Sequence, residues 1–168
     1  MSKVFIINGA PLSGKDSFID AIEAVQPKGA VFRISIIDPI KKVAMQLGWD
    51  GAKTPEGRKF LADLKTLTDD YNGYAMEQVR KFIMTVPEDA VVFVCCREIK
   101  DIECIRSEFD AETIYVKRNV AMQALMSNHA DLESLSDAIN YDYIVDNNGT
   151  LDELVERARE FISKVKGE

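Results

Sequence analysis

The hydrophobic and polar positions of the chain alternate between short apolar runs and longer segments with helical spacing. Residues 4–7 form a continuous apolar run that ends at Asn8-Gly9, as expected of a strand buried on both faces. Residues 16–25 carry apolar side chains at a spacing that places them along one side of a helix. Further apolar runs predict strands over residues 31–37, 91–96, 113–116 and 143–145.

Helical spacing between these runs predicts helices over residues 40–47, 56–68, 74–84, 99–109, 119–140 and 151–165. Glycine and proline punctuate the polar stretch 48–73, which we interpret as an excursion from the main layer of the fold. Strands that alternate with helices predict an α/β domain whose five-stranded parallel sheet is covered on both faces. We therefore expect one domain over residues 1–168.

Composition narrows the classes of partner and compartment. The 168 residues include 21 Lys and Arg against 28 Asp and Glu, which gives a net charge of −7. An acidic chain lacks the cationic field that nucleic acid or an anionic membrane requires, so we expect neither as a partner. The four-residue apolar run near the N-terminus is too short for an export signal or a membrane span. A homodimer is compatible with this composition.

Three cysteines, Cys95, Cys96 and Cys104, give an odd count and no C-x-x-C spacing. This pattern favours neither a disulfide framework nor a zinc site. We therefore expect reduced thiols in a cytoplasmic protein.

The segment between the first predicted strand and helix matches the opening of the phosphate-binding pattern G-x-x-x-x-G-K-[ST]. Its residues are Gly9, Ala10, Pro11, Leu12, Ser13, Gly14 and Lys15. Successive backbone N–H groups and a helix N-terminus in such a loop surround phosphate oxygens, while the lysine reaches the β- and γ-phosphates. A glycine-rich turn without a ligand is the alternative, which the combination of strand, spacing and helix disfavours.

The residue after the lysine departs from the pattern, because Asp16 stands where a hydroxyl usually binds Mg²⁺ and Ser17 follows it. A carboxylate is also a hard ligand for Mg²⁺. Asp16 and Ser17 are therefore the candidate metal ligands.

Other classes of phosphate-loop protein fit less well. The sequence has no N-K-x-D motif for a GTPase, and the strand over 91–96 runs into Arg97-Glu98 rather than a Walker-B carboxylate. A small kinase needs a second anion site opposite the loop. Candidate cations for that site are Lys41, Lys42, Arg58, Arg97 and Arg118.

Several motifs occur in an order that resembles the phage-type deoxynucleoside monophosphate kinases and their bacterial relatives. They are residues 14–17 (GKDS), 35–41 (SIIDPIK), Arg58, Arg97, Lys117-Arg118 and 141–150. The G-K-D variant is shared with animal phosphomevalonate kinases, and the layout with dephospho-CoA kinases. The resemblance implies the three-layer P-loop kinase fold, with an acceptor-binding helical region over about 38–88 and a lid over about 119–140.

The resemblance also implies roles for individual residues. Asp38 follows the second strand and corresponds to the acidic group near the acceptor, although a plain helix N-cap remains open for it. Lys41 lies one helical turn further on. Arg58 corresponds to the acceptor-binding arginine, with an exposed surface arginine as the alternative. Arg97 is suited to bidentate phosphate binding, and the implied catalytic residues are Lys15, Asp38 and Arg97.

Arg118 corresponds to a lid-hinge residue, and Asn148-Gly149 to the place of the adenine ring. The implied reaction is ATP-dependent phosphoryl transfer, with Mg²⁺, to a ribo- or deoxynucleoside monophosphate. A substitution of Asp38 is then expected to slow transfer by mispositioning the acceptor, because its phosphate is already ionised. Two alternatives stay open. One is a kinase of another small acceptor such as dephospho-CoA or phosphomevalonate, and the other is a degenerate kinase that only binds nucleotide.

Overall fold

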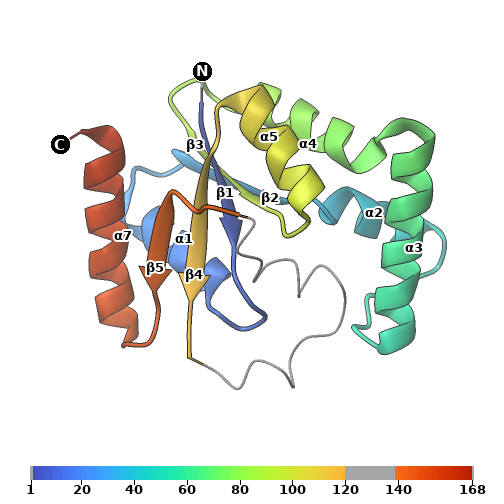
Figure 1. Cartoon of the computed structure of the whole chain (residues 1–168), viewed down its shortest axis with the longest axis horizontal. Helices are drawn as coiled ribbons and strands as arrows, with labels where there is room; N and C mark the ends of the chain where they lie inside the picture. The colour runs from blue at the N-terminus through green and yellow to red at the C-terminus, as the bar shows by residue number, and fades with distance from the viewer. Residues whose placement is uncertain (1, 120–138, 168) are drawn as a thin grey trace. The chain divides into compact units, whose positions relative to one another are not determined.

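The computed structural model describes residues 2–119 and 139–167 and has the predicted α/β architecture (Figure 1). The elements in chain order are β1 (Lys3–Asn8), α1 (Lys15–Val25), β2 (Val31–Ser35), α2 (Asp38–Gln46), α3 (Pro55–Asn72), α4 (Tyr74–Thr85), β3 (Val91–Cys95), α5 (Ile99–Phe109), β4 (Glu112–Lys117), β5 (Tyr143–Asp146) and α7 (Leu151–Lys166).

The five strands form one sheet in the order β2-β3-β1-β4-β5. β1 pairs in parallel with β3 and β4, so that Phe5 lies beside Phe93 on one side and Glu112 on the other. β4 pairs in parallel with β5. The predicted five-stranded parallel sheet is thus confirmed. The strands that follow β1 lie first on one side of it, as β2 and β3, and then on the other, as β4 and β5. The carboxyl edge of β1 is therefore the switch point where open α/β sheets bind ligands.

Side chains of each strand alternate between two faces of the sheet. Phe5 and Ile7 of β1 belong to a buried cluster that also contains residues of α1 and α7, so these two helices cover the same face. α5 lies on the opposite face (Figure 1), where Ile102 and Ile105 are fully buried. This burial on both faces explains why the strands appear in the sequence as continuous apolar runs.

Phe161 of α7 is a central aromatic contact of this core. Its ring centroid lies 5.1 Å from that of Phe5, 5.7 Å from Phe18 and 5.2 Å from Tyr143, each with edge-to-face geometry. These contacts join α7 to α1, β1 and β5. The C-terminal helix therefore helps to fix β1, from which the phosphate-loop segment starts.

The chain divides into two compact units, one formed by Met1–Arg33 with Pro87–Glu168 and the other by Ile34–Val86. The second unit contains α2, α3 and α4 and corresponds approximately to the predicted acceptor region. Within it, the buried Lys65 and the half-buried Asp69 form an ion pair at 3.0 Å, and the Asp69 carboxylate accepts a hydrogen bond from the Ala75 backbone N–H at 3.0 Å. Asp69 thereby holds the turn between α3 and α4.

Two element boundaries differ from the prediction at the start of this second unit. The strand predicted over 31–37 ends at Ser35, because the Ser35 N–H donates to the Asp38 carboxylate at 2.8 Å. α2 begins at Asp38 itself, and Ile37 occupies the N-cap position. The interpretation of Asp38 as an N-cap is therefore wrong. α3 is also longer than the predicted 56–68, with the Thr54 side chain capping its N-terminus.

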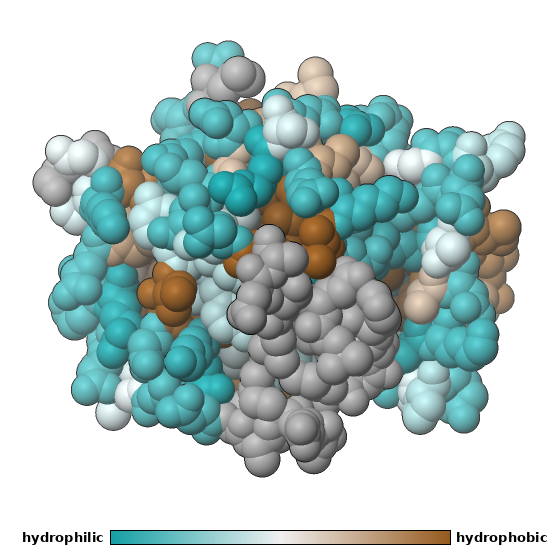
Figure 2. Space-filling view, viewed as in Figure 1, coloured by the Kyte–Doolittle hydropathy of each residue, from teal (hydrophilic) through white to brown (hydrophobic). Residues whose placement is uncertain are grey.

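The predicted helix and lid over about 119–140 fall on residues 120–138, which lie outside the described part of the chain. Among the helices that the structure describes, none combines the length and apolar composition needed to cross a membrane. The face shown in Figure 2 is mostly hydrophilic, with scattered hydrophobic side chains.

Asp142 joins the start of β4 to the segment that leads into β5. Its carboxylate accepts hydrogen bonds from the Thr113 backbone N–H at 2.7 Å and from the Thr113 hydroxyl at 2.8 Å, and Arg106 lies 3.4 Å away. Burial by itself raises the pKa of the Asp142 carboxyl, but the Thr113 hydrogen bonds and the Arg106 charge outweigh it and lower the pKa.

We expect Asp142→Asn to lose stability in a pH-dependent way. A carboxyl whose pKa is lowered by folding stabilises the protein above its unfolded value of 3.8, and this contribution disappears as the pH falls through the folded value. The difference in unfolding free energy between wild type and variant should therefore be largest near pH 7 and shrink below pH 4 in urea titrations. A pH-independent difference for Asp142→Asn would contradict the assignment.

Candidate active site

The phosphate loop, residues 9–14, connects the carboxyl end of β1 to the N-terminus of α1. Gly14 is the N-cap residue of α1 and has a left-handed backbone with φ of 90°. Inside the loop the Ser13 N–H donates to the Ala10 carbonyl at 3.1 Å, and the first helical bond runs from the Phe18 N–H to the Gly14 carbonyl. The loop therefore lies at the positive end of the α1 dipole, which favours anions.

Lys15 folds back over this loop. Its ammonium group donates to the carbonyl oxygens of Gly9 at 2.8 Å and Ala10 at 2.9 Å. These contacts hold the charge beside the loop and at the beginning of α1. An ammonium group with three donors in this place can exchange carbonyl oxygens for phosphate oxygens without a large movement.

Both glycines of the motif are required by close contacts. A Cβ at Gly9, where φ is 150°, would lie 2.5 Å from the Val116 carbonyl oxygen and 2.6 Å from the Ser13 hydroxyl. A Cβ at Gly14 would lie 2.2 Å from the amide nitrogen of Asn147. No side chain fits at either position unless the surrounding atoms move.

Asn147 is a buried residue that binds the phosphate loop directly. Its side-chain amide donates to the Ser13 carbonyl at 2.8 Å, and its backbone N–H donates to the Lys117 carbonyl at 2.7 Å. The adenine site predicted from the sequence, Asn148-Gly149, follows directly after Asn147, whereas this contact with the loop was not predicted. The available signal was a run of polar residues directly after a strand at the same sheet edge as the loop.

Asn148 and Gly149 are exposed in the connection between β5 and α7. The Asn148 backbone N–H donates to the Asp146 carboxylate at 3.0 Å, and its side-chain oxygen accepts from the Asn119 N–H at 2.6 Å. The Asn148 hydrogen bonds, backbone first, lower the pKa of the Asp146 carboxyl. The connection is therefore an ordered turn whose amide groups are largely used within the protein.

The tip of the phosphate loop carries two unusual side chains. Leu12 has a positive φ of 61° and is 71% exposed, although left-handed backbone is unfavourable for leucine. Ser13 is only 1% exposed, and its hydroxyl has no hydrogen-bond partner among the described residues. Pro11 between Ala10 and Leu12 is half-buried.

The candidate metal ligands lie in the first turn of α1, with Asp16 exposed and Ser17 half-buried. Carboxylate and hydroxyl oxygens are donors that suit Mg²⁺, which usually takes one or two protein ligands together with substrate phosphates. Within residues 2–119 and 139–167 no group of three or more His, Cys, Asp or Glu side chains could hold a metal ion. The oxygen donors of Asp16 and Ser17 are of the chemical type that Mg²⁺ prefers.

The predicted acceptor residues Asp38, Lys41 and Arg58 belong to the unit Ile34–Val86. Lys41 pairs with the Asp38 carboxylate at 3.2 Å, so the structure brings these two together on α2. Arg58 is exposed in the first turn of α3, and its Nε donates to the Lys53 carbonyl at 3.3 Å.

Arg97 and Arg118 both follow strands at the carboxyl edge of the sheet. Arg97 is half-buried two residues after β3, and Arg118 is exposed directly after β4. β3 and β4 are the two neighbours of β1, the strand that precedes the phosphate loop. Both arginines therefore follow strands that lie next to β1.

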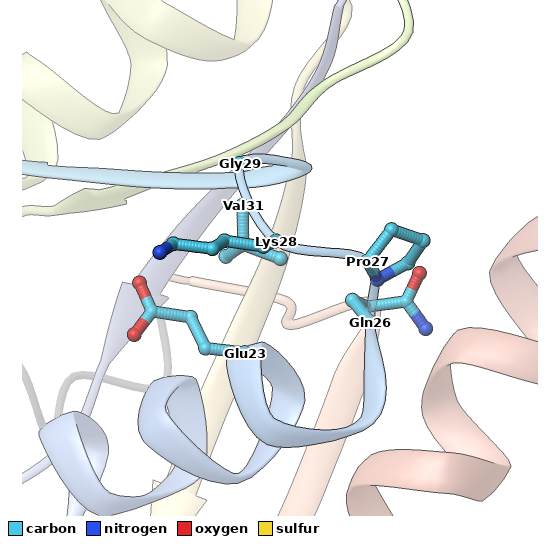
Figure 3. Close-up of a pocket in the computed structure, with 6 residues that line it drawn as sticks. All are labelled: Glu23, Gln26, Pro27, Lys28, Gly29 and Val31. Carbon is cyan, nitrogen blue, oxygen red and sulfur yellow. The ribbon is translucent and has the colours of Figure 1, made fainter.

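A cavity of about 330 Å³ lies in the first compact unit, at the end of α1 and the start of β2 (Figure 3). Glu23 and Lys28 point toward each other across its opening in Figure 3. The Val91 N–H donates to the Ala30 carbonyl nearby, which places the cavity at the amino ends of β2 and β3. It is therefore at the opposite sheet edge from the phosphate loop.

Comparison with protein-family models and with curated protein sequences finds no match to this chain. Three solved structures that are similar to this chain serve as examples, and all three are kinases. The dephospho-CoA kinase from Campylobacter jejuni is 13% identical at a TM-score of 0.55, covering 98% of this chain and 97% of its own. A gluconokinase from Sinorhizobium meliloti 1021 is 14% identical at 0.55, covering 97% and 93%.

Thymidylate kinase from Candida albicans is 12% identical at a TM-score of 0.54, covering 98% of this chain and 92% of its own. At such low identity the likeness concerns the fold. The chain therefore has the α/β fold of the P-loop kinases, with a five-stranded parallel sheet.

We expect Gly14→Ala to destabilise the protein more than Gly29→Ala. Both positions have positive φ, but a Cβ at Gly29 meets no atom within 4 Å, whereas a Cβ at Gly14 strikes Asn147. Left-handed backbone costs alanine about 1–2 kcal/mol, and forced overpacking adds roughly 1–3 kcal/mol. Urea titrations measure the free energy of unfolding of both variants.

The Asn147→Ala background provides the control. There the cost of Gly14→Ala should fall to that of Gly29→Ala, because the steric partner is gone and only the backbone strain remains. An unchanged cost would show that Asn147 does not impose glycine at position 14.

Proposed function

We propose that the protein transfers the γ-phosphoryl group of ATP to a nucleoside or deoxynucleoside monophosphate. The observation that carries this proposal is the phosphate loop, in which the Lys15 ammonium rests on two loop carbonyls at the N-terminus of α1. The loop stands at the switch point of a P-loop kinase fold. Phosphoryl transfer depends on positioning and charge neutralisation, which such a loop supplies.

Lys15 and the loop amides bind the β- and γ-phosphates in this proposal. Arg97, which leaves the sheet beside β1, holds a transferring or accepting phosphate through its planar guanidinium group. Arg118, the first residue after β4 on the other flank of β1, supplies a further positive charge to the phosphates. Mg²⁺ bound with ATP supplies further charge neutralisation, and Asp16 with Ser17 would hold it.

The connection between β5 and α7 is the proposed place of the adenine ring, at Asn148 and Gly149. Three of its backbone N–H groups donate within the protein, from Asn147 to Lys117, from Asn148 to Asp146 and from Thr150 to Glu153. Backbone carbonyls of this connection can accept a hydrogen bond from the adenine N6 amino group. ATP is the proposed donor.

The acceptor is proposed to bind through the Asp38–Lys41 pair and Arg58. Lys41 and Arg58 supply positive charge for the acceptor phosphate, and Asp38 orients Lys41 through their 3.2 Å contact. A phosphate monoester is already largely ionised at neutral pH, because its second pKa is about 6. The reaction consequently needs no strong general base.

A kinase of a different small acceptor is the second candidate function. It is favoured by the names of two of the similar structures, a dephospho-CoA kinase and a gluconokinase. A chain that only binds nucleotide is the third, motivated by Asp16 in place of the usual hydroxyl.

An acceptor panel with ATP and Mg²⁺ distinguishes these three functions. The panel contains all ribo- and deoxynucleoside monophosphates, dephospho-CoA, phosphomevalonate and gluconate, with ADP release as the readout. We expect ADP release that depends on one or a few nucleoside monophosphates. Release with another acceptor would identify the second candidate. Thermal stabilisation by ATP without any acceptor-dependent release would identify a binding module.

We expect Lys15→Ala to lower ATP turnover by about 10²–10³-fold, the usual cost of losing one donor to a developing negative charge. Lys28→Ala is the matched control, because Lys28 lies at the cavity on the opposite sheet edge. Its turnover should stay within about twofold of wild type. Normal turnover by Lys15→Ala would exclude the phosphate loop as the ATP site.

A further inference from the structure

Tyr141 is a residue of the first compact unit that the proposed reaction does not use, yet it is linked to the phosphate loop. Its hydroxyl oxygen accepts a hydrogen bond from the Asn8 side-chain nitrogen at 2.8 Å. Asn8 is the last residue of β1 and is fully buried, and its side-chain oxygen accepts from the Gly9 N–H at 2.8 Å. A three-residue chain therefore runs from Tyr141 through Asn8 to the first residue of the loop.

The direction of the Asn8 amide in this chain is fixed by its partners. The Gly9 backbone N–H can only donate, so the amide oxygen of Asn8 has to face it, and the NH₂ group has to face Tyr141. If the Tyr141 hydroxyl is removed, the buried NH₂ group loses this acceptor. An unsatisfied buried donor is costly, and the amide then turns toward other acceptors and releases Gly9.

Tyr141 itself is held firmly in place. Its ring centroid lies 5.0 Å from that of Tyr115 in β4, and the next residue is Asp142, which is bound to Thr113 at 2.7 and 2.8 Å. Burial raises the pKa of Tyr141 to about 12, although the hydrogen bond from Asn8 lowers it. The hydroxyl is therefore a neutral, fixed acceptor through the physiological pH range.

The position of the Gly9 backbone in turn affects Lys15. Its carbonyl and that of Ala10 are the two acceptors of the Lys15 ammonium, and the Gly9 backbone is packed against Val116. A rotation of Gly9 would turn its carbonyl and move the place where the ammonium rests.

We propose that Tyr141 is a positioning residue of the phosphate loop, which acts through Asn8 on Gly9 and so sets the position of Lys15. This inference rests on the proposed function, in which the loop binds ATP. It assigns Tyr141 no contact with either substrate. The acceptor side of the reaction should therefore be insensitive to it.

The test compares Tyr141→Phe with Tyr143→Phe. Tyr143 is the matched control, because its hydroxyl bonds to Glu112 at 3.0 Å instead of the loop. Tyr141→Phe should lower kcat/KM for ATP about tenfold, which equals about 1.4 kcal/mol, and leave the KM of the acceptor unchanged. Tyr143→Phe should leave both within about twofold, after both variants are checked to be fully folded at the assay temperature. Equal effects of the two variants on ATP, or no effect of Tyr141→Phe, would overturn the proposal.

A double-mutant cycle tests the route. Asn8→Ala and Asn8→Ala combined with Tyr141→Phe should have the same kcat/KM for ATP, because Tyr141 acts only through Asn8. If the double variant instead shows the product of the two single losses in kcat/KM, Tyr141 does not act through Asn8 alone and this route is overturned. If Asn8→Ala fails to fold, the comparison of Tyr141→Phe with Tyr143→Phe alone tests the proposal.

Hydrogen exchange at the Gly9 amide separates this inference from the proposed function. Tyr141→Phe should speed that exchange at least about tenfold, whereas Tyr143→Phe should not. A wild-type chain that binds no ATP would refute the proposed function, and the Gly9 exchange rates would still decide the positioning role. Unchanged exchange in Tyr141→Phe would overturn it even in an active enzyme.

Discussion

A loop that surrounds an anion has to present its backbone N–H groups to the ligand, and this constraint shapes the rest of the candidate site. Such a loop cannot satisfy itself with helical or strand hydrogen bonds. Its conformation is instead fixed from outside by side chains. Asn8 binds the Gly9 N–H, Asn147 binds the Ser13 carbonyl, and Lys15 binds the carbonyls of Gly9 and Ala10. The loop is thus held near both of its ends.

This arrangement makes the site dependent on buried polar groups. Asn8 is fully buried and Asn147 is 8% exposed, so each lost hydrogen bond leaves a donor or acceptor away from water. The benefit is a backbone that is already arranged before phosphates arrive. Electrostatic catalysis gains most when the stabilising groups need no reorganisation during the reaction. The packed face formed by α1, α7 and the sheet supports this arrangement, because Phe161 fixes the strand from which the loop starts.

The sequence alone was sufficient for the sheet and for the glycine-rich loop between its first strand and the first helix, because apolar runs and glycine spacing are local signals. It was insufficient where long-range contacts decide. Asn8 and Tyr141 are separated by 133 residues and Asn147 and Ser13 by 134, and no local pattern predicts either pair. The helix start at Asp38 was missed for a different, local reason, because its carboxylate accepts from the Ser35 N–H three residues earlier instead of capping the helix.

The same sequence separation has a consequence for how the protein is made. β1 and the phosphate loop are translated first, but the partners that shape the loop are near the other end of the chain. Contacts between distant segments form late, since the entropy of closing a long loop must be overcome before they are gained. On the ribosome the loop over residues 9–14 therefore emerges long before its distant partners, Asn147 and, through Asn8, Tyr141. A nascent or prematurely terminated chain that ends before Tyr141 lacks both of these contacts.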